Sequence, residues 1–467
     1  MGETAKYLGQ KGYTIFKDNL DIEEQLLIRK ELMVKPWVPK TSPCKPDPFP
    51  VFRESKKKIY VPRFYGFENY GKADEVRIPE GDTINLQFVG KLRPHQKEAA
   101  NMFLKEGCGL LELFCGFGKT VVALNIISKI KKKTLIIVHK TFLLNQWKER
   151  IQQFLPGARV GTIQGETIDI EDKDIVIGML QSISMKNYPY SIFQQFGLTT
   201  LDECHHLSAE VFSRALFKIV TKHMLGLSAT MKRKDGLTHV FKMFIGRVVY
   251  SKERENANVI IRALKYECQD EEYSKNELNY RGQIAYATMM KKLCSFNRRS
   301  EFILKILKDL LKERSQIMIL AHNKSLLKYL YDAIIYRNME SVGYYVGGMK
   351  EIDLKISESK KIILATFAMA AEGLDIKTLT TLILATPKTD VTQSIGRILR
   401  SQTVEALVVD IIDQHPVFMR QWAKRKAFYK KRNYSILMAN MENYYDQKWK
   451  VLHEKKTKQL PINVCLT

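Results

Sequence analysis

Short apolar runs alternate with longer amphipathic stretches over two parts of the chain. The first part extends from Leu92 to about Tyr250, and the second begins near residue 301 and closes near residues 408–410. The clearest runs are residues 135–138, 174–177, 316–320, 362–364 and 382–384. Runs of this kind are typical of parallel strands whose two faces are both covered by helices. The pattern therefore predicts an α/β protein with two parallel-sheet domains.

The segments outside this alternation have a different composition. Residues 1–88 combine a charged helix-like stretch, a proline-rich run and a basic strand-like segment, which indicates a small accessory module. Residues 251–300 are densely charged and have a helical period, so they predict a helical connector. The predicted order is an N-terminal module (1–88), a first α/β domain (89–250), a connector (251–300), a second α/β domain (301–415) and a basic helical tail (416–467).

Composition supports several cores and a polyanionic partner. The chain has 467 residues, of which 45% are hydrophobic, and this length exceeds what one core usually organises. Lysine and arginine total 75 against 50 acidic residues, which gives a formal charge of +25. Such an excess favours binding to nucleic acid.

The sequence also limits the cellular setting that we expect. No run approaches the length of a membrane span, and the polar start is neither a signal peptide nor a myristoylation site. Seven scattered cysteines without a Cys-x-x-Cys pair favour an intracellular, reducing compartment. The nine histidines lack metal-ligand spacing, so the only metal that we expect is magnesium bound with a nucleotide.

A glycine-rich segment, residues 114–120, follows a short apolar run and opens an amphipathic stretch. Its sequence is Phe-Cys-Gly-Phe-Gly-Lys-Thr, in the strand, loop and helix context of a phosphate-binding loop. Glycines let backbone N–H groups surround phosphate oxygens, while Lys119 would reach the terminal phosphates and Thr120 would ligate magnesium. The full pattern has glycine where this chain has Leu113, so an ordinary glycine-rich turn stays open as the alternative.

Two further groups of residues fit the same chemistry. In a phosphate-loop ATPase, Asp202 would hold magnesium and Glu203 would polarise the attacking water. Near the end of the second domain, Arg397 and Arg400 lie three residues apart on one predicted helix face, where they could stabilise a γ-phosphate across a domain interface. Each group alone could be ordinary surface charge. The order of the three elements, each at a strand end, favours ATP hydrolysis.

This ordered set resembles the motifs of the superfamily 2 helicases over about residues 90–415. The resemblance implies two tandem RecA-like domains that use ATP and Mg²⁺ to move along or unwind nucleic acid. The implied partner is single- or double-stranded DNA, with RNA as an alternative, and transcription or replication proteins are possible further partners.

The resemblance also assigns roles to individual residues. Those implied in ATP binding are Arg93, Gln96 as the adenine reader, Cys115, Gly116, Phe117, Gly118, Lys119, Thr120, Gly373 and Asp375. Those implied in catalysis are Glu203, Gln393, Arg397 and Arg400, with Thr120 and Asp202 for magnesium. Those implied in coupling hydrolysis to strand contacts are His205, Ser228 and Thr230. Those implied in gripping the nucleic acid are His139, Lys140, Thr141 and Thr366.

Finer features resemble one branch of the superfamily. The phosphate loop together with residues 228–237 is similar to the branch that contains XPB, phage UvsW and the poxvirus transcript-release helicase. Residues 60–66 resemble relatives encoded by large double-stranded DNA viruses, which would act in the infected-cell cytoplasm or nucleus, or be carried in the virion. Cys204 and Gln393 depart from the commonest residues of the family, although neither change removes a group that the chemistry needs.

Several interpretations stay open at the level of sequence. Residues 422–432 interleave aromatic and cationic side chains, which suits either nucleic-acid contact or a helix whose aromatics pack inward. Lys56, Lys57 and Lys58 could belong to a duplex-binding module. A kinase or GTPase would leave the second domain and Arg400 unexplained. A catalytically silent scaffold that binds nucleic acid is the other alternative, and an ATPase measurement distinguishes it from a helicase.

Overall fold

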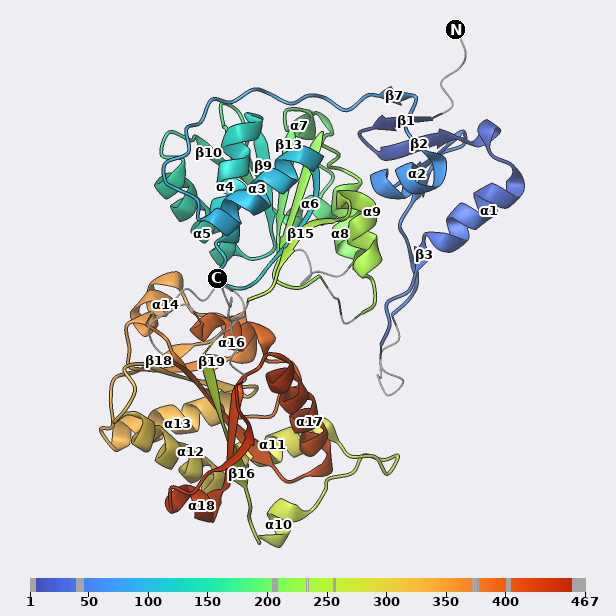
Figure 1. Cartoon of the computed structure of the whole chain (residues 1–467). Helices are drawn as coiled ribbons and strands as arrows, with labels where there is room; N and C mark the ends of the chain where they lie inside the picture. The colour runs from blue at the N-terminus through green and yellow to red at the C-terminus, as the bar shows by residue number, and fades with distance from the viewer. Residues whose placement is uncertain are drawn as a thin grey trace, which may run out of the picture. The chain divides into compact units, whose positions relative to one another are not determined.

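The computed structural model describes residues 6–38, 46–203, 209–231, 233, 235–254, 258–371, 376, 378–399 and 405–455. The chain forms two compact units, Met1–Glu253 and Arg254–Thr467, each of which is built around an α/β sheet (Figure 1). Among the described helices, none combines the length and the apolar character required to cross a bilayer.

The sheet of the first unit has the strand order β11-β10-β12-β9-β13-β14-β8-β15, and only β11 runs antiparallel to its neighbour. Its strands are β8 (Cys108–Leu113), β9 (Thr134–Val138), β10 (Val160–Gln164), β11 (Thr167–Asp169), β12 (Ile175–Met179), β13 (Leu198–Asp202), β14 (His223–Ser228) and β15 (Val248–Lys252). The helices are α3 (Pro94–Glu106), α4 (Lys119–Ile130), α5 (Thr141–Phe154), α6 (Leu180–Met185), α7 (Ser191–Gln194), α8 (Ala209–Leu216) and α9 (Thr238–Ile245).

Both faces of this sheet are buried, as the continuous apolar runs predict. In β9, Leu135 and Ile137 enter a core with α6, α8 and α9, whereas Ile136 and Val138 enter a second core with α3, α4 and α5. This alternation follows from the two-residue period of a strand. Because β8, β13 and β14 are parallel, their carboxyl ends reach the same edge of the sheet.

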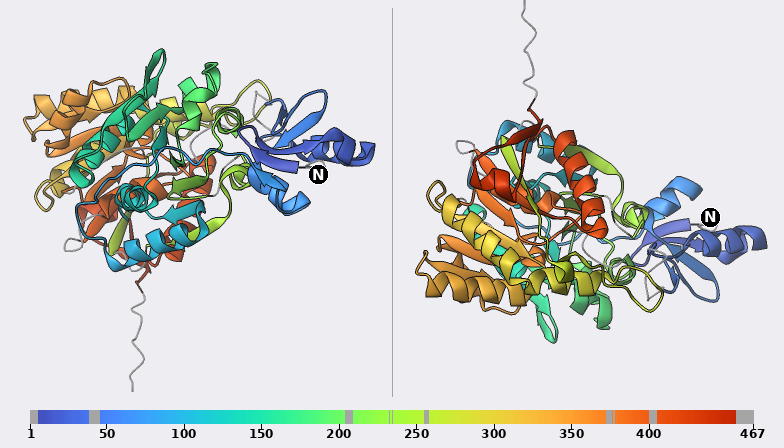
Figure 2. Two further views of the ribbon diagram at one scale, coloured as in Figure 1. Left: turned by 90° about the horizontal axis from the view of Figure 1, so that it is seen from above. Right: turned by 90° about the horizontal axis from the view of Figure 1, so that it is seen from below.

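An N-terminal module belongs to the same unit. Its sheet has the order β5-β6-β2-β1-β7, and β3 pairs with β4. The elements are β1 (Lys6–Gly9), β2 (Gly12–Phe16), the 3-10 helix η1 (Lys17–Asn19), α1 (Ile22–Glu31), β3 (Met33–Val34), β4 (Phe49–Pro50), β5 (Arg53–Glu54), β6 (Lys58–Val61), α2 (Arg63–Tyr70) and β7 (Glu75–Val76). The module, blue in Figure 1, lies to one side of the first sheet, where α2 packs against α9. Figure 2 shows the module to one side of the first domain from above and below.

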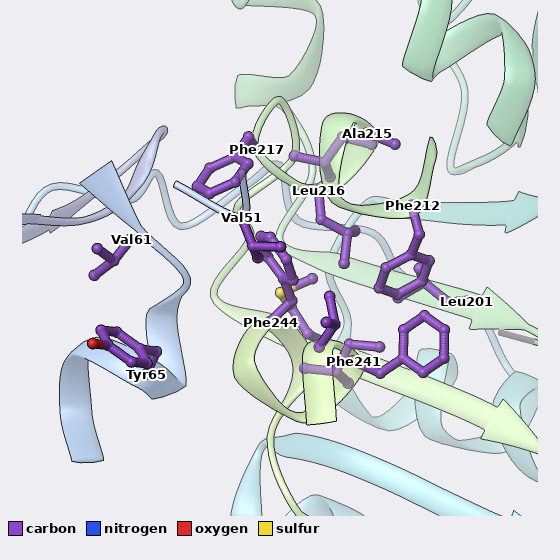
Figure 3. Close-up of a cluster of buried hydrophobic side chains, with 14 of the residues drawn as sticks. Val51, Val61, Tyr65, Leu201, Phe212, Ala215, Leu216, Phe217, Phe241 and Phe244 are labelled. Atoms are coloured by element: carbon purple, nitrogen blue, oxygen red, sulfur yellow. The ribbon is translucent and has the colours of Figure 1, made fainter. Parts of the chain in front are cut away.

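Among the described residues, the core of the module is continuous with that of the first domain. Val61 and Tyr65 join a buried cluster with Phe217 and Phe244, which come from the α8 and α9 region (Figure 3). The Arg63 guanidinium donates to the carbonyl oxygens of residues 221 and 222 at 3.3 and 3.0 Å. The module and the first α/β domain therefore share one hydrophobic core.

The second unit has the strand order β18-β19-β17-β20-β21-β16-β22-β23, and only β23 is antiparallel to its neighbour. Its strands are β16 (Val259–Tyr266), β17 (Ile317–Ala321), β18 (Val342–Tyr345), β19 (Ile362–Thr366), β20 (Thr381–Leu384), β21 (Ala406–Asp413), β22 (Ser435–Asn440) and β23 (Lys450–His453). The helices are α10 (Glu271–Ser274), α11 (Tyr286–Ser295), α12 (Asn297–Leu310), α13 (Lys324–Tyr336), α14 (Glu351–Glu358), α15 (Phe367–Ala371), α16 (Thr392–Ile398), α17 (Pro416–Lys431) and α18 (Met441–Tyr445).

Two expectations for this unit need correction. Residues 251–300, expected as a helical connector, include α11 but also contribute β16, an interior strand paired with β21 and β22. The tail after residue 415 begins with α17 but then adds β22 and β23 to the sheet. In β16 the buried Val259, Ile261 and Ala263 alternate with half-buried residues. Because some of these half-buried positions are charged, the segment lacks the continuous apolar run that marks interior strands such as β9 and β12.

Candidate nucleotide site and its supporting loops

The glycine-rich segment forms the turn between β8 and α4. Gly116 and Gly118 have φ angles of +86° and +93°, a left-handed region that favours glycine, and Lys119 begins α4. Leu113, where the full pattern has glycine, is the buried last residue of β8. The departure from the full pattern therefore lies in the strand, ahead of the turn. The loop closes on the buried Phe117, whose N–H bonds to the carbonyl of residue 114 at 3.1 Å.

Helix α3 braces this turn. The Gln96 side chain donates from Nε2 to the carbonyl oxygen of Phe117 at 2.7 Å and accepts the N–H of Arg93 at 2.9 Å. A Cβ atom at Gly118 would lie 2.4 Å from Gln96 Nε2, so glycine is required there by contact as well as by φ. The structure thus brings Gln96, the predicted adenine reader, to the phosphate loop, and Arg93, predicted to bind ATP, contributes its backbone N–H to this contact. Of the two side chains, Gln96 is buried and Arg93 is exposed.

Two carboxylates lie beside the loop at the end of β13. The Lys119 ammonium forms an ion pair with Glu203 Oε1, and the Trp147 indole N–H donates to Asp202 Oδ2 at 2.9 Å. Glu203 has a φ of +49°, a conformation that costs a residue with a Cβ on the order of 1 kcal/mol or more. The structure therefore places Lys119, Asp202 and Glu203 in one group.

Burial controls the charge of this group. It raises the pKa of the Asp202 carboxyl, and the neighbouring Glu203 raises it further, whereas Lys119 and Trp147 act in the opposite direction. Burial alone would lower the pKa of the Lys119 ammonium, but Glu203 and the other nearby groups outweigh that effect and raise it. The two carboxylates of Asp202 and Glu203 thus have one ammonium group, that of Lys119, beside them. A further cation bound here would be attracted by the excess negative charge.

The remaining loop residues have partly accessible side chains. Cys115 and Thr120 are half-buried, and Thr120 is the second residue of α4. At the next strand, His139 is buried, Lys140 precedes α5 and is half-buried, and Thr141 is the exposed first residue of α5. Of these three residues predicted to grip nucleic acid, only Lys140 and Thr141 present accessible side chains in this conformation.

A third loop at the same edge follows β14. The Ser228 hydroxyl donates to the carbonyl of Thr230 at 2.7 Å and lies 3.2 Å from the Thr230 N–H, so the turn closes on itself. Glu112 of β8 accepts the Met231 N–H at 3.0 Å and the Ser251 hydroxyl at 3.0 Å. Glu112 therefore ties the segment after Thr230 to the strand that carries the phosphate loop. His205, the predicted partner of this turn, lies outside the described residues.

The second unit carries the other predicted residues. Thr366 is the half-buried last residue of β19. Helix α16 buries Ser394, Ile395 and Ile398, whereas Gln393 and Arg397 are half-buried on its other side. Gly373, Asp375 and Arg400 lie outside the described residues.

Two buried ion pairs fix the segment that leads from β20 into α16. Arg425 pairs with Asp410 at 2.7 Å and donates to the carbonyl of Lys388 at 2.6 Å. Arg299 pairs with Asp413 at 2.6 Å and donates to the carbonyl of Ala385 at 2.8 Å. Both acids belong to β21, so this one strand positions the start of the segment that carries Arg397.

The tail helix α17 supports the inward-packed interpretation. Trp422, Arg425 and Tyr429 are buried, and the Tyr429 hydroxyl donates to Asp410 at 2.8 Å. Burial, with the charge of Asp410, holds the pKa of Tyr429 well above its ordinary value. Lys424 and Lys430 lie on the exposed side of the helix.

Comparison with known proteins gives the family. Residues 90–233 match the family described as "Type III restriction enzyme, res subunit". Over 469 residues the chain is 34% identical to L396 of Acanthamoeba polyphaga mimivirus, a protein provisionally named an ATP-dependent RNA helicase, and the match covers 95% of this chain and 89% of L396. The chain belongs to the superfamily 2 helicases.

Other relatives agree with this family. The helicase is 27% identical over 355 residues to QP509L of African swine fever virus, also provisionally named an ATP-dependent RNA helicase, with 70% of this chain and 69% of QP509L covered. Its fold matches that of S. cerevisiae Dbp5 bound to RNA and ADP BeF3 with a TM-score of 0.56 at 13% identity, over 77% of this chain and 92% of Dbp5. The two parallel-sheet units are thus tandem RecA-like domains, and the helicase is an ATP-hydrolysing enzyme that acts with nucleic acid.

Sequence reasoning missed several residues that support the site. Trp147 occupies a core position on α5, and its apolar spacing gives no sign that its N–H reaches Asp202. The side chains of Glu112, Arg299 and Arg425 form hydrogen bonds with backbone groups of residues that are distant in the sequence. A useful signal was available only for Asp410 and Asp413, because acids inside an otherwise apolar strand require buried partners.

Proposed function

We propose that the helicase hydrolyses ATP at the edge formed by the phosphate loop, Asp202 and Glu203, and that hydrolysis drives movement along a nucleic-acid strand. The observation that carries this proposal is the ion pair between Lys119 and Glu203 beside a buried Asp202. In phosphate-loop enzymes, a lysine at the start of a helix binds the triphosphate. Nearby carboxylates hold the metal ion and activate water.

The residues present fit a magnesium ion. Asp202 and Glu203 place two carboxylates beside one ammonium group, and burial raises the pKa of Asp202, so a further cation would favour its ionised form. We propose that Thr120 and Asp202 hold magnesium. When bound, the ion neutralises charge on the phosphate oxygens.

The lysine and glutamate can exchange partners when ATP binds. Lys119 pairs with Glu203 in this conformation, and triphosphate oxygens would give its ammonium group a second acceptor. Movement of Lys119 toward phosphate frees the Glu203 carboxylate to accept a proton from the attacking water. The pair would therefore keep the general base occupied until the substrate is in place.

We also propose that the second domain completes the site. Gln393, Arg397 and Arg400 would face the γ-phosphate, with Gly373 and Asp375 nearby, so that domain closure would stabilise charge in the transition state. Lys140, Thr141 and Thr366 would bind strand phosphates, and His205, Ser228 and Thr230 would couple those contacts to hydrolysis.

We propose that the track, meaning the nucleic-acid strand along which the helicase moves, is DNA. RNA is the second candidate. The similarity of residues 228–237 to the XPB and UvsW branch favours DNA, and we place the helicase in that branch as part of the same proposal. The provisional names of the mimivirus and African swine fever virus relatives favour RNA.

Steady-state ATPase measurements test the site. Glu203→Gln should bind ATP and lose turnover by about 10²–10⁴-fold, the usual contribution of a general base. The matched control is Glu166→Gln, since Glu166 has a side chain that is 91% exposed. Turnover by Glu203→Gln equal to that of the wild type would contradict the assigned role.

A panel of single strands and overhang duplexes, made of DNA, RNA and hybrids, tests the track. We expect DNA to stimulate turnover more than RNA does. A larger stimulation by RNA would move the assignment to the second candidate. A chain with no stimulated turnover, unaffected by Lys119→Ala, would be a silent scaffold.

A further inference from the structure

A tryptophan side chain is exposed in the segment that follows β3. Trp37 is 65% exposed, whereas Trp147 and Trp422 are buried and Trp449 is half-buried. An exposed indole offers a large, rigid aromatic face to a binding partner. Pro36 directly precedes Trp37, and its ring fixes the φ angle of residue 36.

The backbone of Trp37 is attached to the loop that follows the Ser228–Thr230 turn. Its N–H donates to the carbonyl oxygen of Asp235 at 2.9 Å, and a Cβ atom on Gly236 would lie 3.9 Å from the Trp37 Cβ. This loop leaves the carboxyl end of β14, at the same edge as the phosphate loop and Asp202. Trp37 therefore lies beside the loop that we propose couples hydrolysis to strand contacts.

The anchoring loop is itself braced. Arg233 pairs with the Asp235 carboxylate, and its guanidinium lies 4.9 Å from the centre of the Phe241 ring. The Thr238 hydroxyl accepts the Arg233 N–H at 3.0 Å and donates to the Met231 carbonyl at 3.1 Å. The Trp37 backbone is thus held against a braced segment, which limits the backbone ordering that binding would require.

The sequence around Trp37 is strongly basic. Residues 30–58 contain eight lysines and arginines and three acidic residues. Positive charge of this density attracts phosphates, and aromatic faces stack on unpaired bases without selecting among them. Because the segment that carries Trp37 is basic in sequence, a base of a polyanionic strand suits it as a partner better than a neutral or basic protein segment does.

We propose that Trp37 is a stacking platform for an unpaired base of the strand along which the helicase moves. The N-terminal module would then supply one of the contacts on the strand, directly beside the Ser228–Thr230 turn. This proposal rests on the proposed function, since it needs a nucleic-acid track. It predicts little base preference, because every base has a face on which an indole can stack.

Fluorescence titration of the full chain with a deoxythymidine or uridine oligomer tests the platform. Because Trp37 is the most exposed of the four tryptophans, its emission should be quenched on binding and that quenching should be lost in Trp37→Phe. Trp37→Ala should raise the Kd for the oligomer, and the KM for its stimulation of the ATPase, by about tenfold. The kcat at saturating oligomer and the ATPase without oligomer should not change.

The matched control is Ile22→Ala, which removes another exposed apolar side chain of the module, 77% exposed on α1, and should leave all four values unchanged. Trp37→Phe keeps an aromatic face and should bind within about threefold of the wild type. If oligomers stimulate the wild type and Trp37→Ala has the same Kd and KM, the platform is refuted while the motor stands. If no nucleic acid stimulates the wild type, the proposed function itself fails.

Discussion

Replacing Lys119 by methionine removes the cation shared by Asp202 and Glu203. The side chains of Lys119 and Glu203 are 13% and 16% exposed, so solvent screens this ion pair weakly. Loss of one partner from a buried pair costs about 3–5 kcal/mol, because it leaves an uncompensated charge. We expect about 3 kcal/mol, the low end of that range, since the pair keeps some contact with water.

The loss should depend on pH. Burial and Glu203 already raise the pKa of Asp202, and without Lys119 that pKa rises further. A carboxyl group whose folded-state pKa is raised contributes stability below its unfolded pKa and loses it as pH rises through the folded value. The deficit of Lys119→Met relative to the wild type should therefore be larger at about pH 8 than at about pH 5.

Urea unfolding followed by amide hydrogen exchange in β13 and α4 measures this loss without a contribution from the second unit. Adding Glu203→Gln to Lys119→Met should restore about 1–3 kcal/mol at the higher pH, because it removes one of the two like charges. Two results would contradict the shared-cation account of Lys119, Asp202 and Glu203. One is a stability loss of Lys119→Met that is the same at both pH values, and the other is a further loss of stability when Glu203→Gln is added.

Three further changes test other parts of the structure. Gly118→Ala, which forces a Cβ to 2.4 Å from Gln96 at a φ of +93°, should raise the KM for ATP at least tenfold, and an unchanged KM would show that the turn adapts. Tyr429→Phe removes a buried hydrogen bond to Asp410 and should lower the stability of the second unit by about 1.5–3 kcal/mol in thermal melts. Phe244→Ala should cost about 3–5 kcal/mol and make the N-terminal module more sensitive to proteases, whereas equal digestion of variant and wild type would argue against a shared core.

The parts that could be predicted from sequence are those determined by neighbouring residues. The strands β9 and β12 are continuous apolar runs, so both their existence and their burial follow from the sequence. The phosphate loop needs glycines at positive φ and a lysine at the start of a helix, which are all encoded within seven residues. The placement of Lys119 beside Asp202 and Glu203 follows from parallel strands that end at one edge.

The parts that could not be predicted depend on contacts between distant segments. The strand β16 alternates apolar and polar residues, and its sequence alone indicates a connector, because its two strand neighbours come from residues more than 140 positions later. Likewise, the cations of α17 look alike in sequence, yet Arg425 is buried on Asp410 while Lys424 is exposed. Only the position of β21 distinguishes them.

The shared core couples the motion of the N-terminal module to that of the first α/β domain. Helix α8 follows the Asp202–Glu203 end of β13, and α9 follows the Ser228–Thr230 turn, so the helices against which the module packs are those nearest the two loops in sequence. A module that buries Val61 and Tyr65 against Phe217 and Phe244 cannot move freely of those loops, because close-packed interiors transmit displacement. We therefore expect the module and the first α/β domain to move as one body.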